Sequence, residues 1–214
     1  MGAEEQMAKR RKVGNLLALA VLSYLTRAPM HPYELGRTLR DHGDARSIKF
    51  NHGSLYMVVQ QLARAGLIVP QETTREGGRP ERTVYTLTDA GRHELGDWLR
   101  ELVEVPQHEY PQFVAALSLI AALPPSEVVE LLGRRLRRLA EQRAEIRGLV
   151  DSTLAGGVHP LFLVEEEYRL ALLDAESVFV KQFIDQINHP ETGWGRLWGE
   201  LHGEPANTNE RQES

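Results

Sequence analysis

The spacing of apolar residues in the first half of the chain predicts helices interrupted by two short strands. A nearly continuous apolar segment at 16–25 predicts a buried helix over 15–27, which Pro29 terminates. Further helices are predicted over 32–42, over 51–66 and from 88 to about 102, with Asn51 and Thr88 as N-caps. Between them, 67–69 and 83–87 have the apolar and β-branched character of strands. Three helices, a hairpin and a fourth helix predict a winged helix-turn-helix.

The second half shows helical spacing and no strand pattern. Helices are predicted over 112–122, from Ser126 to Ala155 and from Leu161 to Ile187. In the second of these, steps of three and four with one charged break are typical of a coiled-coil seam: Val129, Leu132, Leu136, Leu139, Arg143, Ile146 and Val150. In the third, one stripe holds Val164, Tyr168, Leu172, Ala175, Phe179 and Phe183. The predicted fold class is therefore mainly α, a winged helix-turn-helix followed by an α-helical domain.

Four segments are predicted along the chain. A flexible basic arm occupies 1–12, a DNA-binding domain 13–105, an α-helical dimerisation and effector domain 106–188, and a loosely ordered tail 189–214. Within the tail, Trp194, Leu197, Trp198 and Leu201 have the spacing of a short amphipathic turn that docks. The 214 residues include no cysteine, which excludes disulfides, iron–sulfur clusters and thiol catalysis and favours the cytoplasm.

Charge divides unevenly along the chain. Residues 1–103 hold 15 Lys and Arg against 12 Asp and Glu, whereas the remaining 111 hold 10 against 18. These balances, 15 − 12 = +3 and 10 − 18 = −8, sum to the net charge of −5. A mildly basic first half beside an acidic second half suits a nucleic-acid-binding domain joined to a module with another role, although a chance gradient is the alternative.

The third predicted helix has an unusual outer face. A turn of about 100° per residue places Leu55, Val58, Val59 and Leu62 on one side. The other side holds Gly53, Tyr56, Met57, Gln60, Gln61 and Arg64. Gln pairs with adenine, Tyr bonds phosphate, and Met contacts a thymine methyl, so this face suits the major groove. The alternative is a helix covered by another element of the same chain.

The predicted hairpin tip supplies further basic residues. Gly77 and Gly78 permit a tight turn, and Arg75, Arg79 and Arg82 surround it, which suits contact with phosphates or the minor groove. Interspersed glutamates leave a flexible, solvated loop as the alternative. The predicted DNA-binding residues are Lys49, Asn51, His52, Gly53, Ser54, Tyr56, Met57, Gln60, Gln61, Arg75, Gly77, Gly78, Arg79 and Arg82, with the Lys9–Lys12 arm adding phosphate contacts.

The segments Met30–Leu35, Gly53–Tyr56, Leu62–Ile68 and Gly78–Gly91 stand in the order found in PadR-like transcriptional regulators. The chain resembles that family over about Leu16–Leu102, and its second half is similar to the helical domain of the longer members. Met57 replaces the usual proline after the Leu-Tyr pair, so base readout there is expected to differ. The resemblance implies a cytoplasmic, homodimeric repressor that binds a two-fold symmetric operator and is often released by a small molecule.

The apolar seams of the last helices exceed what one chain needs and predict a homodimer, although a helical hairpin within one chain could also bury them. The predicted interface residues are Leu95, Trp98, Leu102, Leu132, Leu136, Leu139, Leu172 and Phe179. In some members of the resembled family, an aromatic residue at the position of Trp98 stacks on flat ligands. We therefore nominate Trp98 as an effector contact, with ordinary core packing as the alternative.

Catalysis has little support in the sequence. The eight histidines show no metal-ligand spacing, and no nucleophile elbow, phosphate loop or dinucleotide fingerprint occurs. Neither an enzyme nor a cofactor or metal is expected. The predicted function is a sequence-specific transcriptional regulator whose partners are double-stranded DNA, a second copy of the chain and a small molecule, perhaps aromatic. The alternative is a winged-helix module that binds protein instead of DNA.

Overall fold

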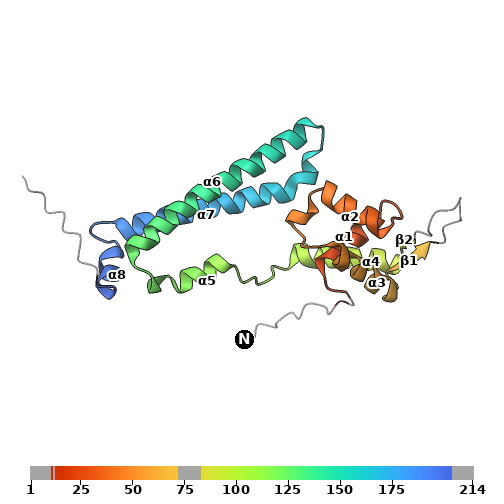
Figure 1. Ribbon diagram of the computed structural model, residues 1–214, viewed down its shortest axis with the longest axis horizontal. Coiled ribbons are helices and arrows are strands. Elements are labelled where there is room, and N and C mark those ends of the chain that lie inside the picture. The colour runs from red at the N-terminus through yellow and green to blue at the C-terminus, as the bar shows by residue number, and fades with distance from the viewer. Residues whose placement is uncertain (1–10, 12, 72–82, 204–214) are drawn as a thin grey trace, which may run out of the picture. The chain divides into compact units, whose positions relative to one another are not determined.

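The computed structural model describes residues 11, 13–71 and 83–203. The chain divides into two compact units between His108 and Glu109, close to the boundary predicted at 105 (Figure 1). Along the described part of the chain, no helix is both long enough and apolar enough to cross a membrane.

The first unit is a winged helix-turn-helix, as predicted. Its elements are α1 (Leu16–Leu25), α2 (Pro32–Asp41), the 3-10 turn η1 (Asp44–Arg46), α3 (His52–Arg64), β1 (Ile68–Gln71), β2 (Val84–Leu87) and α4 (Asp89–Glu104) (Figure 1). The two strands pair antiparallel, with Ile68 opposite Leu87. Met30, ahead of α2, forms an isolated bridge with Tyr85 of β2, which attaches the helix-turn-helix to the hairpin.

Local sequence signals account for where these helices begin. The side chain of Asn15 accepts a hydrogen bond from the backbone N–H of Leu17, and the Thr88 hydroxyl accepts one from Gly91. Pro32 occupies the first helical position of α2, where its missing N–H costs nothing. Gly43, with φ at +77°, ends α2 just after its C-cap in a left-handed conformation that favours glycine.

The core of the first unit gathers around α1, which is apolar on all sides. Leu17, Val21 and Leu22 are fully buried, as are Leu35 from α2 and Leu62 from α3. Each such side chain stabilises the fold by about 1.5–3 kcal/mol relative to an exposed one. This core holds α3 against the rest of the unit by one face only, which leaves its other face for function.

The second unit consists of helices and 3-10 turns throughout its described residues. In order, these are α5 (Gln112–Ser118), η2 (Ile120–Ala122), α6 (Pro125–Ala155), η3 (Pro160–Leu163), α7 (Val164–Asn188) and α8 (Gly195–Leu201) (Figure 1). The two long helices α6 and α7 lie side by side. Arg143, the charged break in the predicted seam of α6, donates through Nε to Asp174 Oδ1 of α7 at 2.6 Å, so the break is an ion pair between the helices.

The packing faces of α6 and α7 differ in part from those predicted. On α6, Val128 is buried, and Val129 is only partly so. On α7, most of the predicted stripe is exposed in the single chain, since Val164, Tyr168, Leu172 and Phe179 all lie on the surface. The α7 residues that are buried instead are Glu166, Leu170, Val180 and Ile187. Both sides of α7 are apolar, and periodicity alone cannot choose between two apolar sides.

The predicted loosely ordered tail begins with a docked helix. Residues of α8 pack on the second unit, with Trp198 only 8% exposed in a cluster with Val128, Val180 and Ile187. Gly193 permits this turn, because a Cβ there would lie 2.2 Å from the carbonyl oxygen of His189. The expectation of a loose tail is therefore wrong for the residues up to Leu201, and the docking predicted for Trp198 is observed.

Candidate nucleic-acid interface

The connection between α2 and α3 is held to α1 by a partly buried hydrogen bond. Tyr24, near the end of α1, donates its hydroxyl to Asp44 Oδ2 of η1 at 2.5 Å. Burial of the ring and this hydrogen bond raise the pKa of Tyr24 above its ordinary value, so the phenol stays protonated and continues to donate. The bond fixes the turn that sets the direction of α3.

The start of α3 is fixed by a capping box. Asn51 Oδ1 accepts from the backbone N–H of Ser54 at 2.8 Å, and Ser54 Oγ accepts from the backbone N–H of Asn51 at 2.9 Å. Both residues were predicted to contact DNA. In the free protein their side chains are engaged in the cap, so their part is to position α3.

The outer face of α3 is open, and its inner face is buried. Leu55, Val58, Val59 and Leu62 all lie in the core, as the helical periodicity predicted. On the opposite side Met57 is 60% exposed, and Gly53, Gln60, Gln61 and Arg64 are also exposed. Within the described part of the chain, none of these side chains forms a hydrogen bond or an ion pair. No other described element of the first unit therefore covers this face.

Three aromatic rings meet at the beginning of α3. The rings of His52 and Tyr56 stack with centroids 4.7 Å apart, and the ring of His31 meets the edge of Tyr56 at 6.5 Å. His31 is the N-cap of α2, where its Nδ1 accepts from the backbone N–H of Tyr33. Tyr56 is thus half-buried between the starts of the two helices, with its orientation restricted by its neighbours. The cap formed by His31 and this aromatic cluster were not predicted from the sequence. The signal that the sequence offered was a histidine at the start of each of the two helices.

Several predicted DNA contacts lie outside the described residues: Arg75, Gly77, Gly78, Arg79, Arg82 and, in the arm, Lys9, Arg10 and Lys12. Lys49 is described and exposed, just before α3. Arg11 of the arm is described, and it faces α4 instead of solvent. Its guanidinium lies 5.1 Å from the ring centroid of Trp98 and forms ion pairs with Glu94, at 2.7 Å, and with Glu101.

The predicted dimer and effector residues fall into two groups. Leu95 and Trp98 are buried in the core of the first unit, Trp98 with 5% exposure, and Leu132 and Leu139 are buried within the second. Leu136 is partly buried against the cluster of α6, α7 and α8. Leu102, Leu172 and Phe179 are exposed. The core and Arg11 together cover the Trp98 indole. This arrangement is the ordinary core packing that was the alternative to a ligand contact.

Within the described residues, no group of three or more His, Asp or Glu side chains is placed to hold a metal ion. The site is instead a helix whose inner face is buried, whose start is capped and whose outer face carries amide, aromatic and thioether groups beside a two-stranded hairpin. A helix of this kind beside a hairpin defines a winged helix-turn-helix protein.

Residues 21–97 match the model of the transcriptional regulator PadR-like family. A curated relative, the negative transcriptional regulator PadR of Bacillus subtilis, is 26% identical over 141 residues, which cover 65% of this chain and 76% of the relative. Residues 21–97 therefore form a PadR-like domain, and the chain is similar to a PadR-like transcriptional regulator. The family resemblance found in the sequence is thereby confirmed.

Solved structures share the fold over most of both chains. Bacillus subtilis PadR in complex with operator DNA is 21% identical, with a TM-score of 0.63 over 81% of this chain and 98% of that chain. The same regulator in complex with p-coumaric acid is 18% identical, with a TM-score of 0.66 over 85% and 99%. A PadR-like regulator from Bacillus cereus is 15% identical, with a TM-score of 0.55 over 82% and 99%. At these identities the likeness establishes the fold.

Proposed function

We propose that this chain is a cytoplasmic, homodimeric repressor that binds a palindromic operator through α3 and is released by a small molecule. The observation that carries the proposal is the outer face of α3, where Met57, Gln60 and Gln61 are exposed on a helix whose start is capped and whose inner face is buried. Such a face matches the donors, acceptors and methyl groups of the major groove. The PadR complexes with operator DNA and with p-coumaric acid support both parts of the proposal by analogy.

Dimerisation is supported by the apolar outer side of α7. Tyr168 and Leu172 are 65% and 52% exposed, and with Val164 and Phe179 they follow one side of the helix at steps of four and seven residues. A continuous apolar stripe of this kind is typical of an interface between proteins. A second copy of the chain that packs here would bury the stripe and bring two α3 helices to the two halves of a palindrome.

The proposal is tested by selecting binding sites from fragmented genomic DNA with the full-length protein. We expect the recovered fragments to share a palindrome whose half-sites are about one helical turn apart. Fragments without a shared motif would contradict specific binding and would favour a winged-helix module that contacts another protein.

Replacing Gln60 by Ala tests the base contact. We expect affinity for the selected palindrome to fall by about 1–3 kcal/mol and preference at one base position to relax, because the amide pairs with a base edge. Affinity for random DNA should change little, as measured by fluorescence anisotropy at fixed salt. An equal loss on both DNAs would assign Gln60 to the phosphate backbone instead.

Replacing Arg75 and Arg79 together by Gln tests the wing. We expect weaker binding to every sequence, because arginines of the wing neutralise phosphates and release counterions. The slope of log affinity against log salt should become shallower by about one unit for each lost phosphate contact. A slope equal to that of the unchanged protein would mean that the wing does not touch the backbone.

A further inference from the structure

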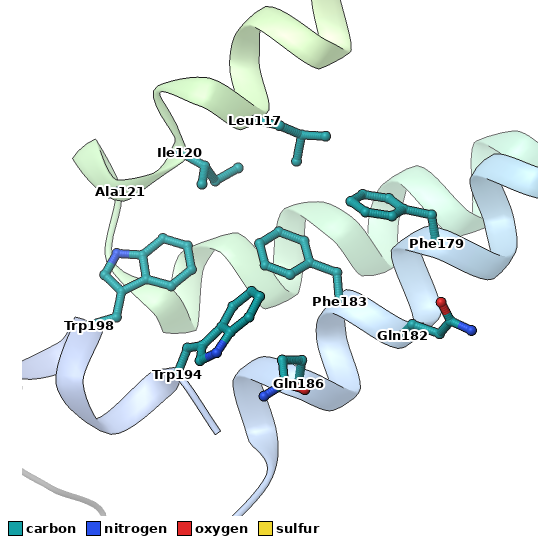
Figure 2. Close-up of a pocket in the computed structure, with 9 residues that line it drawn as sticks. All are labelled: Leu117, Ile120, Ala121, Phe179, Gln182, Phe183, Gln186, Trp194 and Trp198. Carbon is teal, nitrogen blue, oxygen red and sulfur yellow. The ribbon is translucent and has the colours of Figure 1, made fainter. Parts of the chain in front are cut away.

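A cavity of about 570 Å³, open to solvent on one side, lies within the second unit, between η2 and the far end of α7. Figure 2 shows the rings of Phe179, Phe183, Trp194 and Trp198 in a curved row along one wall, with Leu117 and Ile120 on the wall opposite. Neighbouring rings are close, since the centroids of Phe183 and Trp194 are 6.0 Å apart and those of Phe183 and Trp198 6.5 Å. The volume is that of an ordinary small-molecule site.

The cavity is held open by its own chain. Trp198 is buried in the cluster of α6, α7 and α8, so its indole ring stays fixed as part of the wall. On the other side, His202 Nε2, just after α8, lies 2.9 Å from the carbonyl oxygen of Ala121 in η2. This contact connects the two walls at one end of the cavity. A cavity formed by fixed walls is largely ready for a ligand.

The polar side-chain groups of the lining are two amides and the indole N–H groups of Trp194 and Trp198, of which that of Trp198 is buried without a hydrogen-bond partner among the described residues. Gln182 and Gln186 lie one turn apart on the same side of α7, and Gln186 donates through Nε2 to the carbonyl oxygen of Thr192 at 3.2 Å. The lining contains no ionisable side chain. Burial of a charged group here would therefore be uncompensated, whereas a neutral group is tolerated and an amide finds partners.

We propose that this cavity binds a neutral, flat aromatic molecule that carries a carbonyl or amide group. Its rings pack against Phe183 and Trp194, and its polar group hydrogen-bonds to Gln182 or Gln186. The proposal rests on the ligand response of the proposed function and moves the effector site away from Trp98, which the core covers. The last residues of the chain, Glu204–Ser214, are polar and charged, so their composition is a poor match for an aromatic cavity.

Calorimetric titration of the full-length protein with 2-naphthamide tests the proposal, and 2-naphthoate serves as the charged probe of the same shape. We expect saturable binding of the amide at one site per chain and at least tenfold weaker binding of the carboxylate, because no cation in the lining offsets its charge. Equal binding of the two probes would overturn the charge argument, and no binding of either would overturn the proposal.

Two matched variants locate the binding. Ala121 lines the cavity and Ala122 does not, although both are exposed residues of the same short turn η2. We expect Ala121→Phe to fill the cavity and reduce affinity for 2-naphthamide about tenfold or more, and Ala122→Phe to bind like the unchanged protein. Equal affinities in the two variants would place the bound molecule elsewhere and overturn the assignment.

Sedimentation of the same samples separates the ligand from a second copy of the chain. If Ala121→Phe dissociates the protein while 2-naphthamide does not bind the unchanged chain, the cavity belongs to an interface and the proposal fails. DNA binding is measured separately in the absence of ligand. Failure to select a palindrome would contradict the proposed function and leave the calorimetric result intact. Failure to bind 2-naphthamide would contradict the ligand site and leave the DNA-binding result intact.

Discussion

Introducing two carboxylates on the outer side of α7, by Tyr168→Glu and Leu172→Glu, is expected to separate the protein into monomers at micromolar concentration. Both residues are exposed in the single chain, so the substitutions should leave its fold intact. In the dimer, however, each carboxylate would be buried against an apolar surface without a partner, which is costly. Sedimentation equilibrium measures the association, and circular dichroism checks the fold.

The consequence for DNA binding should be large and selective. In a dimer, once one α3 helix has bound its half-site, the other meets the second half-site at a high effective concentration. Monomers lose that advantage. We expect affinity for the selected palindrome to fall by a factor on the order of 10²–10⁴, with little change on an isolated half-site. Anisotropy titrations on the two DNAs measure the difference.

Lys181→Glu is the matched control for this pair of substitutions. Lys181 is an exposed residue of α7 two positions after Phe179, which places it on another side of the helix. The Lys181→Glu substitution changes the net charge by two units, as the pair of substitutions does, so it should reveal any nonspecific effect of added negative charge. If Tyr168→Glu and Leu172→Glu leave a dimer with full affinity for the palindrome, the outer side of α7 is not the interface.

Gly91→Ala should destabilise the first unit by about 3 kcal/mol, because the added methyl group has no space. A Cβ on Gly91 would lie 2.1 Å from the carbonyl oxygen of Leu67 and 2.7 Å from Leu87 Cδ1. The same Leu67 oxygen accepts from the backbone N–H of Thr88 at 3.1 Å and from its hydroxyl at 2.9 Å. Moving α4 to relieve the overlap would therefore break the joint between α4 and the hairpin.

Thermal unfolding followed by circular dichroism measures this effect, and Gly96→Ala in the same helix is its control. A Cβ on Gly96 would meet only the exposed end of Arg100, at 3.3 Å, which can move aside. That variant should be as stable as the parent or gain up to about 1 kcal/mol from helix propensity. We expect Gly91→Ala to lower the melting temperature by more than about 10 °C. Melting temperatures that agree between the two variants would contradict the close approach.

The sequence alone determined the class of fold and most of the α3 surface. Strong local signals account for this, since caps at Asn51 and Thr88 start helices where predicted and Gly43 ends α2. On α3 the inner residues are aliphatic and the outer ones polar or mixed, so periodicity gives the correct face. One of the motifs shared with PadR-like regulators, Gly78–Gly91, contains the Thr88 cap.

Tertiary structure decided which apolar surfaces the single chain uses. On α7 both sides are apolar, and only packing against α6 selects Leu170 and Val180 as buried and leaves Leu172 exposed. Likewise, the spacing of Trp98 on α4 is compatible with an interface or with a core. In the structure, the core of the first unit and Arg11, which is distant in sequence, bury its indole ring. The aromatic cavity joins η2 to the end of α7 and to α8, and a long stretch of sequence separates η2 from both. Such contacts depend on how helices meet in space, which local spacing does not encode.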